Sequence, residues 1–162
     1  MPRDGASRFS EFGPAASAFA VFFFCVTACT PTKHTIEPYS SDPKAAHDIE
    51  ERADNVCSRP ASDRPPRRFT TDGCSMFPDD GWVSCCVEHD FEYWCGGSSE
   101  DRHNADTRLR ECVAQKKSEM LGWLMWAGVR VGGIPWSPFP WRWGYGWDCC
   151  RGYDSRTASA SP

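Results

Sequence analysis

Nine residues near the middle of the chain, from Cys85 to Tyr93, restrict its fold more than any other feature. Written as a helix, CCVEHDFEY puts Cys85, His89 and Tyr93 on one face, because residues three and four apart lie side by side. Asp90 lies about a quarter-turn away, since each residue turns the helix by roughly 100°. A histidine between a carboxylate and a water is suited to act as a general base. The alternative interpretation is that His89 is a core histidine whose ring nitrogens both have hydrogen-bond partners.

The chain has 162 residues and ten cysteines, which is many for this length. This number is typical of a protein braced by disulfides in an oxidising compartment. Adjacent cysteines such as Cys85 and Cys86 are expected to pair with distant partners rather than with each other. Eight cysteines remain when Cys25 of the leader and Cys29, the lipidation candidate described below, are set aside, and they allow on the order of 100 pairings. These candidates are Cys57, Cys74, Cys85, Cys86, Cys95, Cys112, Cys149 and Cys150.

Residues 1–28 are expected to form an export signal. Two arginines precede an apolar run at residues 15–28, which is shorter than the roughly 20 residues that a membrane span needs. The sequence Val-Thr-Ala-Cys that ends at Cys29 is similar to a bacterial lipobox, so Cys29 is a candidate for lipidation. This interpretation predicts an exported lipoprotein in the outer membrane or periplasm of a bacterium. The alternatives are an ordinary signal peptide cut nearby and an uncleaved anchor.

Residues 29–68 are polar and rich in proline and serine, which predicts a tether with one short helix at residues 45–56. The domain itself is expected at residues 69–151, followed by a disordered tail at 152–162. It begins with a loop, residues 69–81, in which proline, glycine and aspartate are dense. Several carboxylates and free carbonyls in one loop suit calcium, which takes oxygen ligands. A surface turn with solvated acids is the alternative.

Two helices are predicted after this loop. The first covers Trp82–Cys95 and ends at a glycine pair, and a capping box at Ser98–Asp101 opens the second. Helices joined by so few residues lie antiparallel. Asp106 is nearer than Asp101 to the centre of the face turned toward His89, so Asp106 is favoured as its partner. That face consists of Arg102, Ala105, Leu109, Cys112, Val113 and Met120.

A third predicted helix at residues 121–131 precedes a segment rich in tryptophan, proline and glycine. So much proline and glycine at residues 135–147 excludes a regular helix or a central strand. Its tryptophans fit either a patch for the membrane–water boundary or the filling of a small core. Arg142 fits a phosphate contact or a cation–π stack. The predicted fold class is mostly α: two antiparallel disulfide-linked helices with a calcium-type loop, plus this irregular segment.

The stretch from Cys85 to Tyr93 resembles the catalytic helix of the phospholipase A2 superfamily, written C-C-x-x-H-D-x-x-Y. The upstream loop is similar to the secreted bacterial branch, in which a T-D-x-C loop and a P-D element come first. Here these elements are Thr71–Cys74 and Pro78–Asp79. The resemblance covers roughly residues 69–115, and its motif is fairly specific.

The resemblance implies a site as well as a fold. Asp72, the Gly73 carbonyl and Asp90 would form a calcium cage, which makes Ca²⁺ the implied cofactor. The implied activity is calcium-dependent hydrolysis of phospholipid acyl esters at a membrane surface.

The resemblance also assigns the groups around the attacking water. His89 would be the general base that takes a proton from water. Asp106, with Asp101 as the alternative, would orient His89, and Tyr93 would help to orient that aspartate.

The chain departs from the family pattern at several points. The glycine-rich calcium loop of animal members is absent, and the spacing from Asp72 to His89 is shorter than in the bacterial members. Glu92 stands where a cysteine is common, and the tryptophan-rich tail has no counterpart. These departures leave substrate choice open.

Two other functions remain as alternatives. Zinc could be held by a set of cysteine and histidine ligands, although an oxidising compartment argues against it. A non-catalytic, lipid-anchored envelope protein could use the same scaffold to bind lipid or a partner. The net charge of −4 gives no electrostatic case for nucleic acid. The zinc set would be Cys74, Cys85, Cys86, His89 and Cys112.

Overall fold

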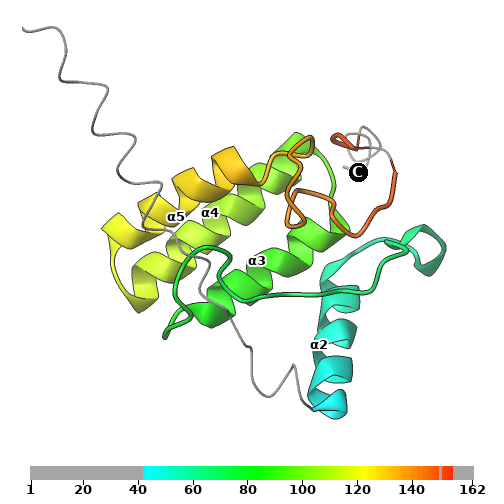
Figure 1. The fold of residues 1–162 in the computed structure, drawn as a ribbon, viewed down its shortest axis with the longest axis horizontal. Coiled ribbons are helices and arrows are strands. Elements are labelled where there is room, and N and C mark those ends of the chain that lie inside the picture. Colours follow the sequence, from blue (N-terminus) through cyan, green and yellow to red (C-terminus); the bar gives the residue numbers. More distant parts are fainter. Residues whose placement is uncertain (1–41, 150, 155–162) are drawn as a thin grey trace, which may run out of the picture. The chain divides into compact units, whose positions relative to one another are not determined.

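The computed structural model describes residues 42–149 and 151–154. Within these residues the chain is mostly helical and forms no β-strand, which confirms the predicted class (Figure 1). α4 packs against both α3 and α5, and α2 packs against α3. The expected leader, Cys29, Cys150 and residues 155–162 lie outside the described residues. The elements are α2 (Pro43–Val56), the 3₁₀ turn η1 (Ala61–Asp63), α3 (Val83–Cys95), α4 (Ser99–Lys116) and α5 (Glu119–Gly132).

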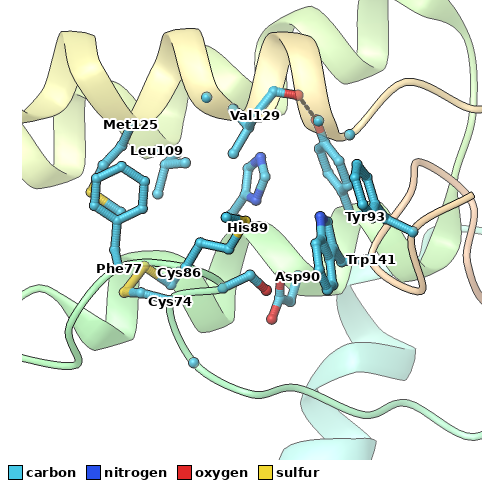
Figure 2. A pocket seen from close by; sticks show the side chains of 17 residues that line it. Cys74, Phe77, Cys86, His89, Asp90, Tyr93, Leu109, Met125, Val129 and Trp141 are labelled. Atoms are coloured by element: carbon cyan, nitrogen blue, oxygen red, sulfur yellow. Dashed lines mark hydrogen bonds between the residues drawn. A yellow bond between two sulfur atoms is a disulfide. The ribbon is translucent and has the colours of Figure 1, made fainter. Parts of the chain in front are cut away.

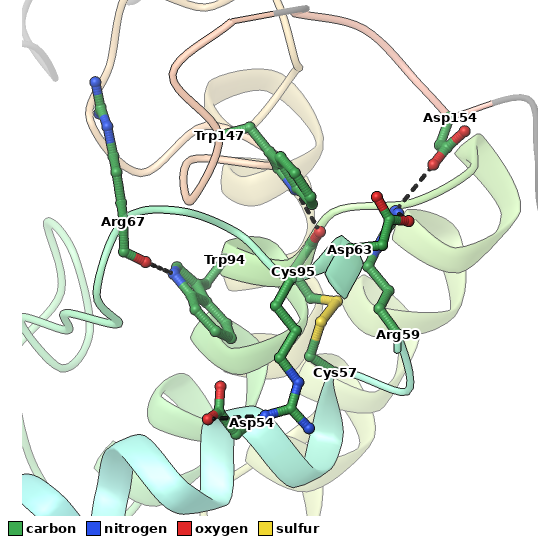
Figure 3. The surroundings of a disulfide bond; sticks show 10 residues. Asp54, Cys57, Arg59, Asp63, Arg67, Trp94, Cys95, Trp147 and Asp154 are labelled. Carbon is green, nitrogen blue, oxygen red and sulfur yellow. Dashed lines mark hydrogen bonds and ion pairs between the residues drawn. A yellow bond between two sulfur atoms is a disulfide. The ribbon is translucent and has the colours of Figure 1, made fainter. Parts of the chain in front are cut away.

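Helix α2 and the residue after it are fastened to the end of α3. The Asp42 side chain caps α2 by accepting a hydrogen bond from the Lys44 amide at 2.9 Å. Ala53 is fully buried, and Cys57 forms a disulfide with Cys95 (Figure 3). The short helix predicted at residues 45–56 is confirmed as α2. The structure also packs residues 43–57 on α3, because a disulfide and a buried apolar side chain hold them.

The junction between α3 and α4 follows the predicted signals. Gly96, at φ 68°, ends α3 in a conformation that favours glycine. A capping box opens α4: the Ser98 amide donates to Asp101 at 2.8 Å, and the Asp101 amide donates to the Ser98 hydroxyl at 3.1 Å. The disulfide Cys85–Cys112 joins the first turn of α3 to the last part of α4. The glycine end and the capping box are therefore confirmed.

Helix α5 begins earlier than the sequence predicts. Ser118 caps it by accepting a hydrogen bond from the Leu121 amide at 3.3 Å. Met120 consequently belongs to the first turn of α5 and is 81% exposed, so its predicted place on the buried face of the second helix is wrong. Gly122 brings α5 close to α4, because a Cβ there would lie 2.6 Å from the Arg110 carbonyl oxygen.

The C-terminal segment covers the end of α3. The Gly144 amide donates to the Tyr93 carbonyl at 2.7 Å, and the Gly146 amide donates to the Trp94 carbonyl at 3.2 Å. The Trp147 indole donates to the Cys95 carbonyl at 2.9 Å (Figure 3). The last carbonyls of a helix have no partner inside the helix, so this segment supplies the partners that α3 lacks.

The tryptophans divide between buried and exposed positions. Trp143 is buried and donates to the Gly97 carbonyl at 3.0 Å, whereas Trp123 and Trp136 are about half exposed. Arg142 is buried and donates to backbone carbonyls of its own loop. In the part of the chain that the structure covers, no helix combines the length and apolar character needed to cross a membrane.

Candidate active site

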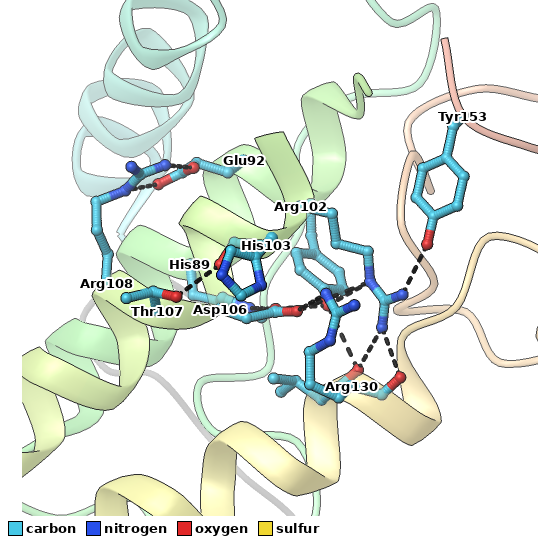
Figure 4. A network of polar contacts seen from close by, with 11 residues as sticks. His89, Glu92, Arg102, His103, Asp106, Thr107, Arg108, Arg130 and Tyr153 are labelled. Carbon is cyan, nitrogen blue, oxygen red and sulfur yellow. Dashed lines mark hydrogen bonds and ion pairs between the residues drawn. The ribbon is translucent and has the colours of Figure 1, made fainter. Parts of the chain in front are cut away.

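The centre of the site is a buried hydrogen bond between α3 and α4. His89 Nε2 lies 2.9 Å from Asp106 Oδ1, and the Tyr93 hydroxyl donates to the same oxygen at 2.8 Å (Figure 4). His89 is 6% exposed and Asp106 is fully buried. His89 and Tyr93 are one helical turn apart on α3, so their side chains can reach the same carboxylate.

A second row of groups holds the other oxygen of this carboxylate. Arg130 donates to Asp106 Oδ2 at 2.9 Å from α5. Arg102, buried on α4, donates to the Tyr93 hydroxyl at 3.2 Å and to the Val129 carbonyl at 2.9 Å. The two arginines therefore join α4 and α5 around the aspartate (Figure 4). Their roles were not predicted, although an arginine on a buried face signals a carboxylate partner, because an unpaired buried charge is costly.

These contacts favour the ionised form of Asp106. Burial acts to raise the pKa of Asp106, but the hydrogen bond and charge of His89, with hydrogen bonds from Arg130 and Tyr93, outweigh it and lower the pKa. Burial and the Asp106 charge raise the pKa of Tyr93. An ionised carboxylate only accepts hydrogen bonds, so His89 Nε2 carries the proton. The remaining nitrogen, Nδ1, is left to accept a proton in the neutral imidazole.

The two aspartates considered as partners for His89 have different positions. Asp106 receives His89, Tyr93 and Arg130. Asp101 lies in the first turn of α4 and takes part in the capping box.

An apolar cavity of about 130 Å³ adjoins His89 (Figure 2). Most of its lining is apolar, and the residues with polar side chains in the lining include Ser75, His89, Asp90 and Tyr93. Glycines of α5 leave room on one side. The main apolar groups in the lining are Phe77, Leu109, Met125, Val129, Phe139 and Trp141. The cavity thus places a largely apolar surface beside the imidazole of His89.

The predicted calcium loop lies beside α3. A disulfide between Cys74 and Cys86 fastens it to the helix. The Thr71 hydroxyl donates to Asp90 Oδ2 at 2.6 Å, and the Gly73 amide donates to the Thr71 hydroxyl at 3.1 Å. Three of the predicted residues, Asp72, Gly73 and Asp90, are therefore brought into one region.

The loop concentrates negative charge. Burial raises the pKa of Asp90 well above its ordinary value, and the charges of Asp72 and Asp79 raise it further, against the lowering effect of the Thr71 hydrogen bond. A cation would relieve this repulsion. Within residues 42–149 and 151–154, no three His, Cys, Asp or Glu side chains converge as a metal site. Calcium also takes backbone carbonyl oxygens, so two carboxylates and the Gly73 carbonyl are a donor set of the right chemistry.

The disulfides decide against the zinc alternative. All four cysteines of that set are oxidised and cannot ligate a metal as thiolates. No family model, curated protein or solved structure matches the chain. The function is therefore inferred from the geometry of the site itself.

Proposed function

We propose that the protein is a calcium-dependent hydrolase of phospholipid acyl esters, similar to phospholipase A2. The observation that carries this proposal is the 2.9 Å contact between His89 Nε2 and Asp106 beside an apolar cavity. That contact leaves Nδ1 as the basic nitrogen, and Asp90 lines the same cavity. A base, a place for a lipid chain and an acidic loop then lie together.

The finer fold proposed with it is an antiparallel, disulfide-linked helix pair with a calcium loop. Cys85–Cys112 connects the start of α3 to the end of α4, and a short glycine turn connects their other ends. The Cys74–Cys86 disulfide would hold the calcium loop at the first turn of α3.

The proposed reaction needs no protein nucleophile. His89 would remove a proton from a water as that water attacks the ester carbonyl, a contribution typically of about 10²–10⁴-fold. Asp106 would hold the imidazole orientation and stabilise its cation, and Tyr93 and Arg130 would hold Asp106. Calcium, when bound by Asp72, Asp90 and the Gly73 carbonyl, would supply a Lewis acid for the developing oxyanion.

A membrane surface is the proposed location of the substrate. The outer side of α5 exposes large apolar side chains, and Phe139 is both exposed and part of the cavity lining. Export and lipidation at Cys29 would place the domain at such a surface. The exposed apolar residues of α5, here named the α5 outer face, are Met120, Trp123, Leu124 and Val131.

The test is fatty-acid release from phospholipid vesicles by the purified full-length chain. Release is expected with calcium, to stop with a calcium chelator, and to be abolished in His89→Gln. His103→Gln is the matched control, because His103 is an exposed histidine on α4. A folded protein that binds no calcium and releases no fatty acid would reject the enzyme and favour the non-catalytic lipid-anchored scaffold.

A further inference from the structure

Asp90 lines a second cavity in addition to the apolar cavity beside His89, which is here named the acyl cavity. The volume of the second cavity is about 250 Å³, and its lining comes from three parts of the chain. The loop supplies Thr70, Thr71 and Asp72, α3 supplies Asp90, and the C-terminal segment supplies Pro140, Trp141 and Tyr145.

The two cavities adjoin at Asp90 and Trp141, since both residues line both cavities. Figure 2 shows the Trp141 ring beside Asp90, below His89. Phe139 stacks on Trp141 with ring centroids 5.0 Å apart and the planes 5° from parallel. Phe139 belongs to the lining of the acyl cavity, so it supports Trp141 from that side. A molecule that occupies both cavities must pass Trp141.

The second cavity combines aromatic rings with carboxylates. Tyr145 is held in place because its hydroxyl donates to the Thr70 carbonyl at 2.6 Å. Trp141 and Tyr145 thus form an aromatic wall in a cavity whose lining also includes Asp72 and Asp90. Tryptophan and tyrosine rings attract ammonium cations, and such walls are used to recognise quaternary ammonium groups.

We propose that the C-terminal segment 139–145 selects phospholipids with an ammonium-bearing headgroup, choline above all, and that Trp141 is the residue that contacts this group. This inference rests on the proposed function, since it assigns the headgroup to the second cavity and the acyl chain to the first. It also gives the tryptophan-rich segment a role in substrate choice.

The binding test uses His89→Gln, so that no lipid is consumed, with calcium present. Monomeric dodecylphosphocholine and dodecylphosphoglycerol share a chain and a phosphate, and only the first carries an ammonium group. Equilibrium dialysis is expected to show about tenfold tighter binding of dodecylphosphocholine. Trp141→Leu should remove this preference while keeping chain binding, and Trp141→Phe should keep part of it.

Trp136→Leu is the matched control. Trp136 lies in the same segment, is 58% exposed and packs against Tyr153 rather than in either cavity lining. The headgroup preference should survive this change. Equal affinity for the two detergents, or a preference that persists in Trp141→Leu, would overturn the inference.

Activity measurements separate the inference from the proposed function. Faster release from choline than from glycerol lipids, lost in Trp141→Leu, supports both. Equal release from both lipids overturns the headgroup inference and leaves the enzyme standing. Release from neither lipid rejects the enzyme, and the dialysis result then decides the headgroup inference alone.

Discussion

Arg130 Nη1 lies 2.9 Å from Asp106 Oδ2, so α5 holds the oxygen of this carboxylate that His89 does not use. Three elements thus meet at one buried acid. This arrangement explains why Asp106 stays ionised without solvent, because hydrogen bonds and opposite charge replace the lost hydration.

Asp106→Asn should damage both activity and stability. The amide keeps the shape but removes the charge that stabilises the imidazolium, so kcat should fall by about 10²–10⁴-fold. It also leaves two arginines without their carboxylate, which should cost about 3 kcal/mol of unfolding free energy. Fatty-acid release and urea unfolding measure the two effects. Asp101→Asn is the control, which should cost about 1 kcal/mol through the helix cap and keep its activity. If Asp101→Asn lost more activity than Asp106→Asn, Asp101 would be the partner of His89.

Stability should fall with acid in a way that depends on Asp106. Its pKa is lowered in the folded state, so its contribution is complete above the ordinary aspartate pKa of about 4 and is lost as the pH falls through the lower folded value. Urea unfolding from about pH 6 to pH 2 should therefore show a steeper acid decline in the natural chain than in Asp106→Asn. If the unfolding free energies of the natural chain and of Asp106→Asn fell equally with pH, the prediction would be wrong.

Asp90 should behave in the opposite sense. Its pKa is raised in the folded state, so its contribution is present below the ordinary aspartate pKa and is lost as the pH rises through the folded value. In the absence of calcium at neutral pH, Asp90→Asn should therefore stabilise the protein, because the amide avoids the cost of ionising a buried carboxyl group beside Asp72. The same change should abolish calcium binding, which calorimetry can measure. A destabilised variant that still binds calcium would exclude Asp90 as a ligand.

Removing disulfides should separate stability from calcium affinity. Among the three disulfides seen in the described residues, the Cys57–Cys95 bond closes the longest segment, with a separation of 38 residues, and its loss should cost about 4 kcal/mol. The Cys74–Cys86 bond, with a separation of 12, should cost about 3 kcal/mol but weaken calcium binding more, because it holds the loop. Paired alanine variants, followed by thermal unfolding and calcium titration, make the comparison. Equal calcium affinity in both would argue against a calcium loop.

A charge on the α5 outer face should weaken vesicle binding without unfolding the protein. Leu124 is 58% exposed, so Leu124→Glu should lower vesicle affinity about tenfold while leaving thermal stability unchanged. Val56→Glu, at an exposed apolar position on α2, is the control and should bind as the natural chain does. Sedimentation with vesicles measures the vesicle affinity of both variants. An equal loss of affinity in both would place the membrane contact outside the α5 outer face.

Local signals in the sequence were sufficient for much of the fold. The helical class, the glycine that ends α3 and the Ser98–Asp101 capping box depend on neighbouring residues, and all three are confirmed. Cys85 and Cys86 pair with distant cysteines, as predicted, because adjacent side chains on a helix point in different directions. The exact pairing depends on how α4 and the loop pack against α3, which neighbouring residues do not indicate.

Features that depend on distant contacts could not be predicted. The packing of α2 relies on a disulfide to Cys95, and nothing near Cys57 indicates that partner. The C-terminal segment has no hydrophobic period, and its shape follows from hydrogen bonds to α3 such as Gly144 to Tyr93. At the site, helix geometry ranked Asp106 over Asp101, but the contribution of Arg130 depends on how α5 packs on α4.

The adjacent cysteines at the start of α3 point to two neighbours at once. Cys85 is bonded to α4, which carries the carboxylate, and Cys86 is bonded to the loop that carries Asp72. His89 follows Cys85 by one helical turn. The two disulfides therefore set the distance of its imidazole from α4 and from the loop that carries Asp72. Reducing these two disulfides would therefore loosen the position of the imidazole relative to α4 and to the loop in a single step.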